Sequence, residues 1–326
     1  MAVRWNAETL WETLSPLLPG LSIEVLPQTT STNTVLLDRA RAGDAGHRAD
    51  DDAGDDAGDS GLAQVRRSRE SAAFRRRSAD VAPCLLVAEH QTGGRGRMGR
   101  TWTSAAGASL TFSLSLPMDG LDWSGLSLAV GVALAEALAP SPGTTHGPDG
   151  PRIGLKWPND LWLLDGPAHA PGEAVAPVAG RKLGGILIES VAVGGHRLAV
   201  VGVGLNVLPQ PAEAAEGFTH GHACLQELHP GLGAPEALAR VAQPLVQALL
   251  DFRDGGFARF HDRFAARDLL RGQPVTTTLA DLPEGVAEGV APNGALRVRT
   301  PDGGLHEVAS GEVSVRLQGR AGSAPC

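Results

Sequence analysis

A buried strand that ends in a loop rich in glycine and arginine constrains this chain more than any other feature. The apolar run Cys84-Leu85-Leu86-Val87-Ala88 has the length and composition of an interior β-strand. It leads directly into residues 89–100, which hold four glycines and three arginines, Arg95, Arg97 and Arg100. Glycines let backbone N–H groups approach a ligand closely, and arginines offer planar cationic forks to carboxylate or phosphate. The stretch predicts an anion-binding loop, and a surface turn with solvated arginines is the alternative.

Length and charge limit the classes of protein to which the chain can belong. Its 326 residues suggest two or three domains, or one large domain with appendages. The net charge of −8 argues against a general polyanion binder, so we expect no DNA partner. Cys84, Cys224 and Cys326 are scattered without ligand spacing, which indicates a reducing compartment. Without an apolar leader or a membrane-length apolar run, we expect a cytoplasmic protein without membrane contact.

A polar run, Ser31-Thr32-Asn33, follows the strand expected at residues 22–26 and opens a helix. Capping of that helix by Ser31 or Thr32 explains the run without any ligand. An amide such as Asn33 at a helix start can also face a pocket, so both interpretations stay open. Residues 43–80, with an aspartate-rich half and an arginine-rich half, contain few large apolar side chains. We expect a disordered or loosely ordered charged insertion there.

A second informative stretch is the run from Ile153 to Leu163, which Pro158 interrupts. Proline breaks a strand, so Lys156, Asn159 and Asp160 are expected at a kink between two short strands. A lysine inside an apolar strand is costly unless its ammonium group meets an anion or a cavity. Pairing of Lys156 with Asp160 at a simple turn is the alternative.

Two further strands carry glycines, in residues 180–189 and 200–207. Gly184-Gly185, Gly202 and Gly204 predict a smooth wall that a ligand or a neighbouring strand can approach. No Walker A pattern occurs in the chain. The spacing of His220, His222 and Cys224 is too loose to indicate a metal site, and we assign no metal ligands.

Other segments predict the remaining architecture. Residues 110–116 alternate between apolar and small polar side chains, which indicates a half-buried strand. Helices are expected at 6–18 (capped by Asn6), 126–138, 235–252 and 256–267, and Pro/Gly-rich loops at 140–152 and 165–180. From Arg271 onward, short alternating segments and the turns Asn293-Gly294 and Asp302-Gly303 predict a small five-stranded module at 271–318, without evident chemistry of its own.

Taken together, the motifs resemble those of biotin protein ligases. The matching runs, which occur in the family's order, are Ser31-Thr32-Asn33, Gly94-Arg95-Gly96-Arg97-Met98-Gly99-Arg100, Lys156-Trp157-Pro158-Asn159-Asp160, Lys182-Leu183-Gly184-Gly185-Ile186-Leu187, Gly204-Leu205-Asn206 and Gly311-Glu312-Val313-Ser314-Val315-Arg316. The resemblance covers residues 22–318 apart from the charged insertion and the 165–180 loop.

The resemblance implies an α+β fold, in which a mixed β-sheet flanked by helices, like that of class II synthetases, precedes a small SH3-like β-barrel. The implied domains are a catalytic domain at 1–268, with the insertion at 43–80, a C-terminal β domain at 269–319 and a tail at 320–326. The implied reaction uses ATP and Mg²⁺ to convert biotin into biotinyl-5′-AMP. A lysine of a biotin carboxyl-carrier protein, of acetyl-CoA carboxylase or another biotin-dependent carboxylase, then takes the biotinyl group.

The resemblance also assigns residues to roles. The catalytic residues are Lys156, Arg97 and Asp160. The biotin-binding residues are Ser31, Thr32, Asn33, Gln91, Gly94, Arg95, Gly96, Arg97, Lys156 and Gly185. The nucleotide-binding residues are Arg95, Arg97, Arg100, Trp102, Asn159, Lys182 and Asn206. Asp160 would orient or deprotonate the incoming lysine, or hold magnesium. The loop of residues 89–100 would close over the intermediate.

Two alternative functions accompany this interpretation. A lipoate or octanoate ligase or transferase shares the catalytic architecture, but it lacks the combined arginine-loop and Lys-Trp-Pro-Asn-Asp motifs. A non-catalytic biotin-binding regulator is a different class, against which Arg97, Lys156 and Lys182 argue. Repression through DNA is not expected, because no helix-turn-helix motif precedes residue 22. The oligomeric state is either monomer or homodimer.

Overall fold

The computed structural model describes residues 3–52, 81–139, 152–165, 180–209, 221–309 and 315–317, and for residues 43–52 and 152 it describes the backbone alone. The helices are α1 (Ala7–Leu14), α2 (Thr32–Asp52), α4 (Leu126–Leu138), α5 (Ala234–Gly255) and α6 (His261–Ala265). Short 3-10 turns are η2 (Arg97–Gly99), η4 (Leu225–Glu227) and η5 (Phe257–Phe260). The main sheet comprises β1 (Ser22–Leu26), β2 (Cys84–Ala88), β5 (Ser109–Pro117), β6 (Arg152–Lys156), β7 (Asp160–Leu164), β8 (Gly180–Val193) and β9 (His196–Asn206).

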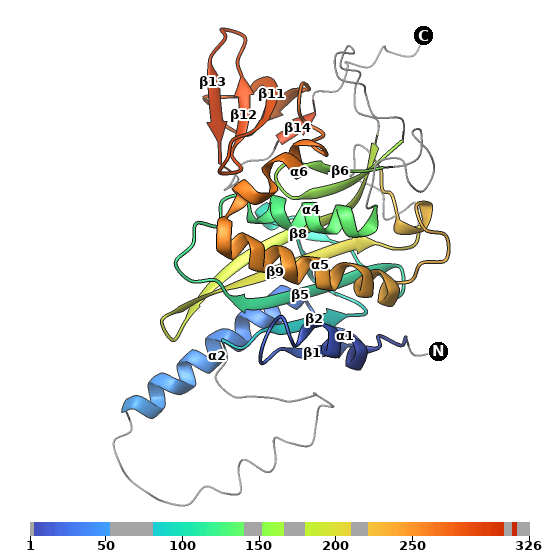
Figure 1. Cartoon of the computed structure of the whole chain (residues 1–326), viewed down its shortest axis with the longest axis vertical. Helices are drawn as coiled ribbons and strands as arrows, with labels where there is room; N and C mark the ends of the chain where they lie inside the picture. The colour runs from blue at the N-terminus through green and yellow to red at the C-terminus, as the bar shows by residue number, and fades with distance from the viewer. Residues whose placement is uncertain are drawn as a thin grey trace, which may run out of the picture.

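The main sheet crosses the middle of the molecule in the order β1-β2-β5-β9-β8-β7-β6 (Figure 1). β1 and β2 run parallel, and every other neighbouring pair is antiparallel. The four strands β6 to β9 follow one another as a meander, with short turns between β6 and β7 and between β8 and β9. The predicted mixed sheet with flanking helices is confirmed.

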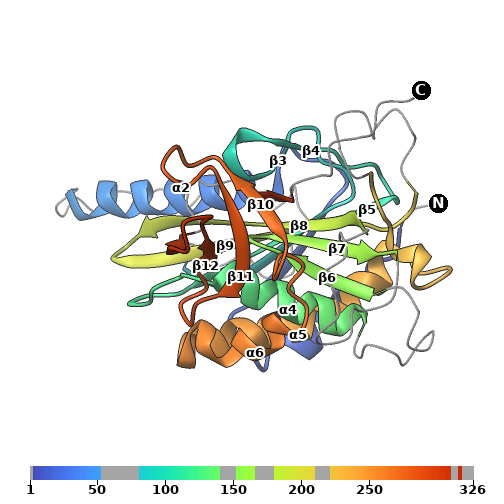
Figure 2. The same cartoon turned by 90° about the horizontal axis from the view of Figure 1, so that it is seen from above.

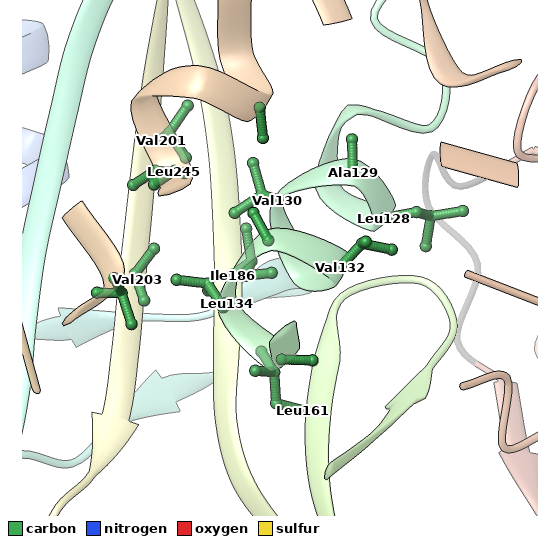
Figure 3. Close-up of a cluster of buried hydrophobic side chains, with 14 of the residues drawn as sticks. Leu128, Ala129, Val130, Val132, Leu134, Leu161, Ile186, Val201, Val203 and Leu245 are labelled. Carbon is green, nitrogen blue, oxygen red and sulfur yellow. The ribbon is translucent and has the colours of Figure 1, made fainter. Parts of the chain in front are cut away.

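Helices cover both faces of this sheet. Figure 2 shows α4, α5 and α6 on one face and α2 on the other. α4 is apolar on all sides, and ten of its thirteen residues are buried between the sheet and α5. Figure 3 shows this packing through Leu128, Val130, Val132 and Leu134 of α4, Ile186, Val201 and Val203 of the sheet, and Leu245 of α5. Because each buried Leu or Val contributes about 2 kcal/mol, this layer anchors the strands that carry the site.

On the opposite face, α2 packs Leu36, Leu37 and Ala40 against β2, β8 and β9. Because of this second layer, the strand predicted to be half-buried at 110–116 is buried on both faces. Thr111, Ser113 and Ser115 are all at most 5% exposed, so both faces of β5 are buried. Alternation with small hydroxyl side chains therefore marks a strand whose polar face contacts α2 and the neighbouring strand rather than water.

The C-terminal sheet has the strand order β13-β12-β11-β10-β14. Its strands are β10 (Pro274–Thr277), β11 (Glu284–Val290), β12 (Leu296–Arg299), β13 (Leu305–Val308) and β14 (Val315–Leu317). Both predicted turns are present: Gly294 (φ 82°) lies between β11 and β12, and Gly303 (φ 90°) between β12 and β13. The indole N–H of Trp157 donates to the carbonyl oxygen of Gly294 at 3.0 Å, which joins this sheet to the β6–β7 hairpin.

Some sequence predictions differ from the structure. Asn6 has left-handed backbone geometry and makes no side-chain capping bond, so α1 begins at Ala7 without the predicted cap. α2 continues to Asp52, so the backbone at 43–52 is helical where we expected a loose insertion. The rest of that insertion (53–80), and the loops at 140–151 and 166–179, lie outside the described residues.

Two of the three cysteines, Cys84 and Cys224, lie within the described residues. Cys84 and Cys224 carry free thiols, and burial raises the pKa of both. Cys326 lies outside the described residues, and the reducing compartment stays a prediction. Within the described ranges, no helix is both long enough and apolar enough to span a membrane.

Candidate functional site

A cavity of about 730 Å³ opens where α2, the Gly/Arg loop, the sheet and β14 meet. Its volume lies in the range of ordinary ligand pockets, about 300–1,000 Å³. The predicted site residues that line it are Ser31, Thr32, Asn33, Gln91, Arg95, Gly96, Arg97, Arg100, Trp102, Lys156, Asn159, Asp160, Lys182 and Gly185. Segments separated by more than 100 residues therefore converge on one cavity.

One side of the site is a buried network of neutral polar groups. The oxygen Oε1 of Gln91 accepts from the Thr32 backbone N–H at 2.7 Å, and the Thr32 hydroxyl oxygen lies 3.2 Å from it. Ser113 of β5 connects Thr32 to Asn33, with its hydroxyl 2.6 Å from Thr32 Oγ1 and 2.6 Å from Asn33 Oδ1. These side chains are at most 8% exposed. Since α2 begins at Thr32, the helix start holds Thr32 and Asn33 against the sheet.

The β6–β7 hairpin places the second motif. A cis peptide bond between Trp157 and Pro158 forms its turn, with Lys156 and Asp160 paired across the two strand ends. The ammonium group of Lys156 donates to the carbonyl oxygen of Val315 on β14 at 2.9 Å. Burial lowers the pKa of Lys156; the nearby cations, including Lys182, add to this effect, and Asp160 opposes it.

Lys156 and Asp160 are neighbours across the hairpin, but the ion pair predicted between them as the alternative is wrong. Asp160 forms its ion pair with Lys182, whose Nζ lies 2.8 Å from Oδ1, and both side chains are mostly buried. Lys182 also lies 6.0 Å from the ring centroid of Trp102. Asn159 donates to the carbonyl oxygen of Ile186 at 2.7 Å, a bond that fixes the turn against β8.

The Gly/Arg loop folds back as a two-stranded sheet, β3 (Gly94–Arg95) with β4 (Thr101–Trp102). Arg95 forms an ion pair with Glu189 at 2.6 Å and a hydrogen bond with Thr34 at 3.2 Å. Burial lowers the pKa of Arg97, and the Arg100 charge adds to this effect. An anion beside Arg97 would relieve that desolvation cost.

The glycine-rich strands do not leave the open wall that the sequence suggested. The space above Gly202 holds the amide of Asn33, and the space above Gly204 holds the indole of Trp102. The closest atoms to a Cβ added at Gly184 belong to Leu205 and to the Gly204 carbonyl. Only Gly185 has room for an added Cβ, with Asp160 and Lys182 nearest. The glycines of β9 therefore admit side chains of the protein, which in turn line the cavity.

Two predicted site residues lie elsewhere, and two contributors were not predicted. Asn206 is buried outside the cavity lining and donates to the carbonyl oxygens of Lys182 and Ala223. Gly94 packs against Trp102 and is likewise not among the described lining residues. Glu189 bonds both Arg95 and Asn33, and Arg316 lines the cavity from β14, which we had assigned no chemistry. The sequence signal that could have identified Arg316 is the motif of residues 311–316, which ends at this arginine.

The cavity carries a strong excess of positive charge. Its described lining includes six cationic side chains, namely Arg95, Arg97, Arg100, Lys156, Lys182 and Arg316, and a single carboxylate, Asp160. In a chain of net charge −8, such a local excess indicates an anionic ligand. Together with the neutral network, the cavity suits a ligand that has a polar uncharged part and an anionic part.

Comparisons with known proteins identify the family. The profile of the biotin/lipoate A/B protein ligase family matches residues 65–206, and that of the biotin protein ligase C-terminal domain matches residues 271–316. The bifunctional ligase/repressor BirA of Escherichia coli is 30% identical over 306 residues, which are 92% of this chain and 75% of that protein. The chain belongs to the biotin protein ligase family.

Other members of the family agree with this assignment. The biotin--[acetyl-CoA-carboxylase] ligase of Paracoccus denitrificans is 33% identical over 232 residues, which are 67% of this chain and 85% of that ligase. The solved biotin protein ligase from Aquifex aeolicus, in complex with biotin and ATP, matches with a TM-score of 0.61 at 23% identity. The match covers 91% of this chain and 99% of that one and confirms the fold that the resemblance implied.

Proposed function

We propose that this biotin protein ligase activates biotin with ATP and transfers it to a lysine of a biotin carboxyl-carrier protein. The observation that carries the proposal is the meeting of a neutral hydrogen-bonding network and a cationic cluster in one cavity. Biotin offers a neutral ureido ring and an anionic carboxylate, and ATP offers an anionic phosphate chain. Each part of these substrates has a chemically matched group in the site.

The neutral network suits the ureido ring. A ureido group combines N–H donors with a carbonyl acceptor, and it needs partners of both kinds when it leaves water. Thr32, Gln91 and Ser31 line the cavity with hydroxyl and amide groups. Because these side chains are buried and several are already bonded to one another, little conformational entropy is lost when the ring binds.

The cationic cluster suits the first chemical step. The biotin carboxylate attacks the α-phosphorus of ATP, forms a new oxygen–phosphorus bond and releases pyrophosphate. Two unit charges of like sign at 4 Å repel by about 4 kcal/mol at an effective dielectric constant near 20. Arg97, Arg100 and Lys156 can offset a repulsion of this size, since all three line the cavity.

Lys156 is the residue we assign to charge stabilisation in the transition state. Its ammonium group is buried, which lowers its pKa, and its hydrogen bond goes to the neutral carbonyl of Val315. A phosphate oxygen is a stronger acceptor because its hydrogen bond to ammonium is charge-assisted. A donor aimed at developing charge in a site shielded from water contributes about 3 kcal/mol to catalysis.

In the second step, the carrier lysine attacks the acyl carbonyl, the bond to phosphate breaks, and AMP leaves with the electron pair. Asp160 orients the incoming amine and accepts its proton in this proposal. The carboxylate lies at the cavity and is held by Lys182. The loop of residues 89–100 keeps water from the mixed anhydride, with Arg95 as its attachment to β8 through Glu189.

Magnesium belongs to the proposal as a partner of the nucleotide. Asp160 is the one carboxylate in the described cavity lining, and the described residues include no cluster of three or more metal-binding side chains. Mg²⁺ at nucleotide sites commonly takes one or two carboxylates, with phosphate oxygens and water as its other ligands. Asp160 would supply that carboxylate, and the ion would neutralise phosphate charge.

The decisive experiment is a transfer assay on the full chain. The protein is mixed with biotin, ATP, Mg²⁺ and a biotin carrier domain, and the intact mass of the carrier is followed. We expect the mass increase of one biotinyl group, and no increase on a carrier whose acceptor lysine is replaced by arginine. Lipoate and octanoate replace biotin in parallel reactions.

Each alternative function has its own outcome in that assay. Transfer of lipoate or octanoate in preference to biotin would assign the chain to those activities instead. Tight biotin binding without adenylate formation or transfer would assign a regulatory role. The carrier domain of acetyl-CoA carboxylase is the proposed partner, and carriers of other biotin-dependent carboxylases are tested beside it.

A further inference from the structure

Glu189 occupies a position that the proposed reaction does not yet use. It lies on β8, its side chain is 21% exposed, and it is not among the described residues that line the cavity. Its two carboxylate oxygens have different partners. Oε1 accepts from the Arg95 guanidinium at 2.6 Å, and Oε2 accepts from the Asn33 amide nitrogen at 2.9 Å. A single carboxylate therefore joins the Gly/Arg loop to the start of α2.

The carboxylate of Glu189 and the carbonyl of Leu187 together determine how the Asn33 amide is oriented. An ionised carboxylate only accepts hydrogen bonds, so Asn33 must turn its NH₂ group towards Glu189. The same NH₂ group donates to the Leu187 carbonyl oxygen at 3.1 Å. Both donors of Asn33 are then used, and its oxygen Oδ1 points to the Ser113 hydroxyl at 2.6 Å. Gly202 lies beneath this amide and leaves space for it.

The orientation of the Asn33 amide fixes the direction of the hydrogen bond made by the Ser113 hydroxyl. A serine hydroxyl has one proton, and Ser113 gives that proton to Asn33 Oδ1. The 2.6 Å contact between Ser113 and Thr32 then requires the Thr32 hydroxyl to be the donor, so its single proton goes to Ser113 and not to Gln91 Oε1, which is farther away at 3.2 Å. The lone pairs of the Thr32 oxygen are left to accept a hydrogen bond. The Gln91 amide is oriented separately, because its oxygen accepts from the Thr32 backbone N–H.

We propose that Glu189 is a positioning residue that sets the hydrogen-bond polarity of the neutral end of the cavity. Its negative charge makes the Thr32 oxygen an acceptor, while the orientation of Gln91 leaves the Gln91 NH₂ group as a donor. Such a pair matches a ring that presents an N–H group next to a carbonyl group. The inference rests on the proposed function, in which that ring is the ureido ring of biotin.

Glutamine at position 189 is the sharpest substitution because it keeps size and shape. Both partners of Glu189 are donors, and a glutamine offers them only one oxygen. Its NH₂ group would face either Arg95 or the Asn33 NH₂ group, and rotation of Asn33 would instead place Oδ1 against the Leu187 carbonyl oxygen. Arg95 is 47% exposed and can bond water, whereas a donor of the buried Asn33 left unsatisfied costs about 1–3 kcal/mol.

The experiment compares the wild type, Glu189→Gln and Glu189→Asp as full-length proteins. Calorimetry gives the Kd for biotin, and carrier biotinylation gives KM and kcat. We expect Glu189→Gln to raise Kd and KM for biotin about 10- to 100-fold, with kcat and the KM for ATP within about threefold. Glu189→Asp keeps the charge and recovers part of the affinity. 2-Iminobiotin, in which an N–H group replaces the ureido oxygen, tests the hydrogen-bond polarity of the neutral end. We expect the preference for biotin over 2-iminobiotin to fall about tenfold in Glu189→Gln.

Glu24→Gln is the matched control. Glu24 on β1 accepts from both terminal nitrogens of Arg39 on α2 at 2.9 Å, so it is also a strand glutamate paired with an arginine, but it lies outside the cavity lining. Wild-type biotin affinity and ligand preference in Glu189→Gln would overturn the role of Glu189. An equal rise in KM in both variants would overturn it as well. Absence of biotin transfer by the wild type would instead contradict the proposed function.

Discussion

Lys156 on β6 donates its hydrogen bond to Val315 on β14, a residue 159 positions further along the chain. The bond joins the main sheet to the C-terminal sheet at the cavity, where the next residue, Arg316, also contributes to the lining. The C-terminal sheet is therefore part of the site as well as a neighbour of it. A ligand anion that replaces the Val315 carbonyl as the partner of Lys156 would exchange a neutral acceptor for a charged one.

Lys156→Met is expected to slow adenylate formation about 100- to 1,000-fold, because one donor aimed at developing charge is lost. Biotin still binds in this variant, since the neutral network of Thr32, Asn33 and Gln91 does not depend on Lys156. Exchange of labelled pyrophosphate into ATP measures the first step, and calorimetry measures biotin binding. Arg240→Met, at an exposed position on α5, is the control. Normal pyrophosphate exchange in Lys156→Met would contradict the assigned role.

Most of the fold could be predicted because its signals are local. Pro158 marked the break between β6 and β7, and the apolar run at 126–138 matches α4 residue for residue. Burial of the β5 hydroxyls could not be predicted, since it depends on α2, whose Thr32 and Asn33 contact Ser113 on that face. The missing Asn6 cap has a similar origin: the left-handed backbone there is not visible in residue type.

The site could be predicted as a set of residues but not as a set of contacts. Sequence motifs placed Lys156, Asp160 and Lys182 together, yet the choice of Lys182 as the partner of Asp160 follows from the register between β7 and β8. Glu189 was missed because a lone glutamate in a strand gives no signal until Arg95 and Asn33 are brought to it. Asn206 was assigned to the nucleotide, but in the structure it bonds two backbone carbonyls.

Gly204→Ala is expected to weaken nucleotide binding. An added Cβ would lie 2.5 to 2.9 Å from the Trp102 indole, so the ring must shift out of its place in the cavity wall. Overpacking of this kind costs about 1–3 kcal/mol, which corresponds to a rise of roughly 5- to 150-fold in the KM for ATP. Trp102→Phe removes the ring atoms that clash, so the double variant should lose less than the two single variants added together. Strict additivity would contradict the proposed contact.

The buried carboxyl group of Asp268 should make the stability of the fold depend on pH. Burial raises the pKa of this carboxyl group to about 6 from 3.8, and Oδ2 has no hydrogen-bond partner among the described residues. The folded state therefore holds the proton more tightly than the unfolded state. The stabilising contribution is fully present below pH 3.8 and is lost as the pH rises through about 6. The difference amounts to about 3 kcal/mol at neutral pH.

Asp268→Asn removes this titration while its oxygen can still accept from the Leu270 N–H, the bond that Asp268 makes at 2.9 Å. We expect urea unfolding between pH 4 and 7 to show a flatter stability profile for Asp268→Asn than for the wild type, and higher stability at pH 7. Asp281→Asn, at an exposed position between β10 and β11, should follow the wild-type profile. Parallel profiles for wild type and Asp268→Asn would contradict the assignment.

The chain contains only two lysines, Lys156 and Lys182, and both line the cavity, so an amine-reactive reagent reports on the site directly. Apart from these two lysines, the reagent has only the terminal α-amine as a target. Burial lowers the pKa of Lys156, which raises its neutral, reactive fraction relative to an ordinary lysine. Biotin with a non-hydrolysable ATP analogue, each at 100 times its Kd, should slow acetylation of both lysines by at least about tenfold, because only ligand-free protein reacts. Peptide mass spectrometry measures the two rates, with the α-amine as the internal control. If these ligands left the acetylation rates of Lys156 and Lys182 unchanged, they would bind elsewhere, and the cavity would not be the active site.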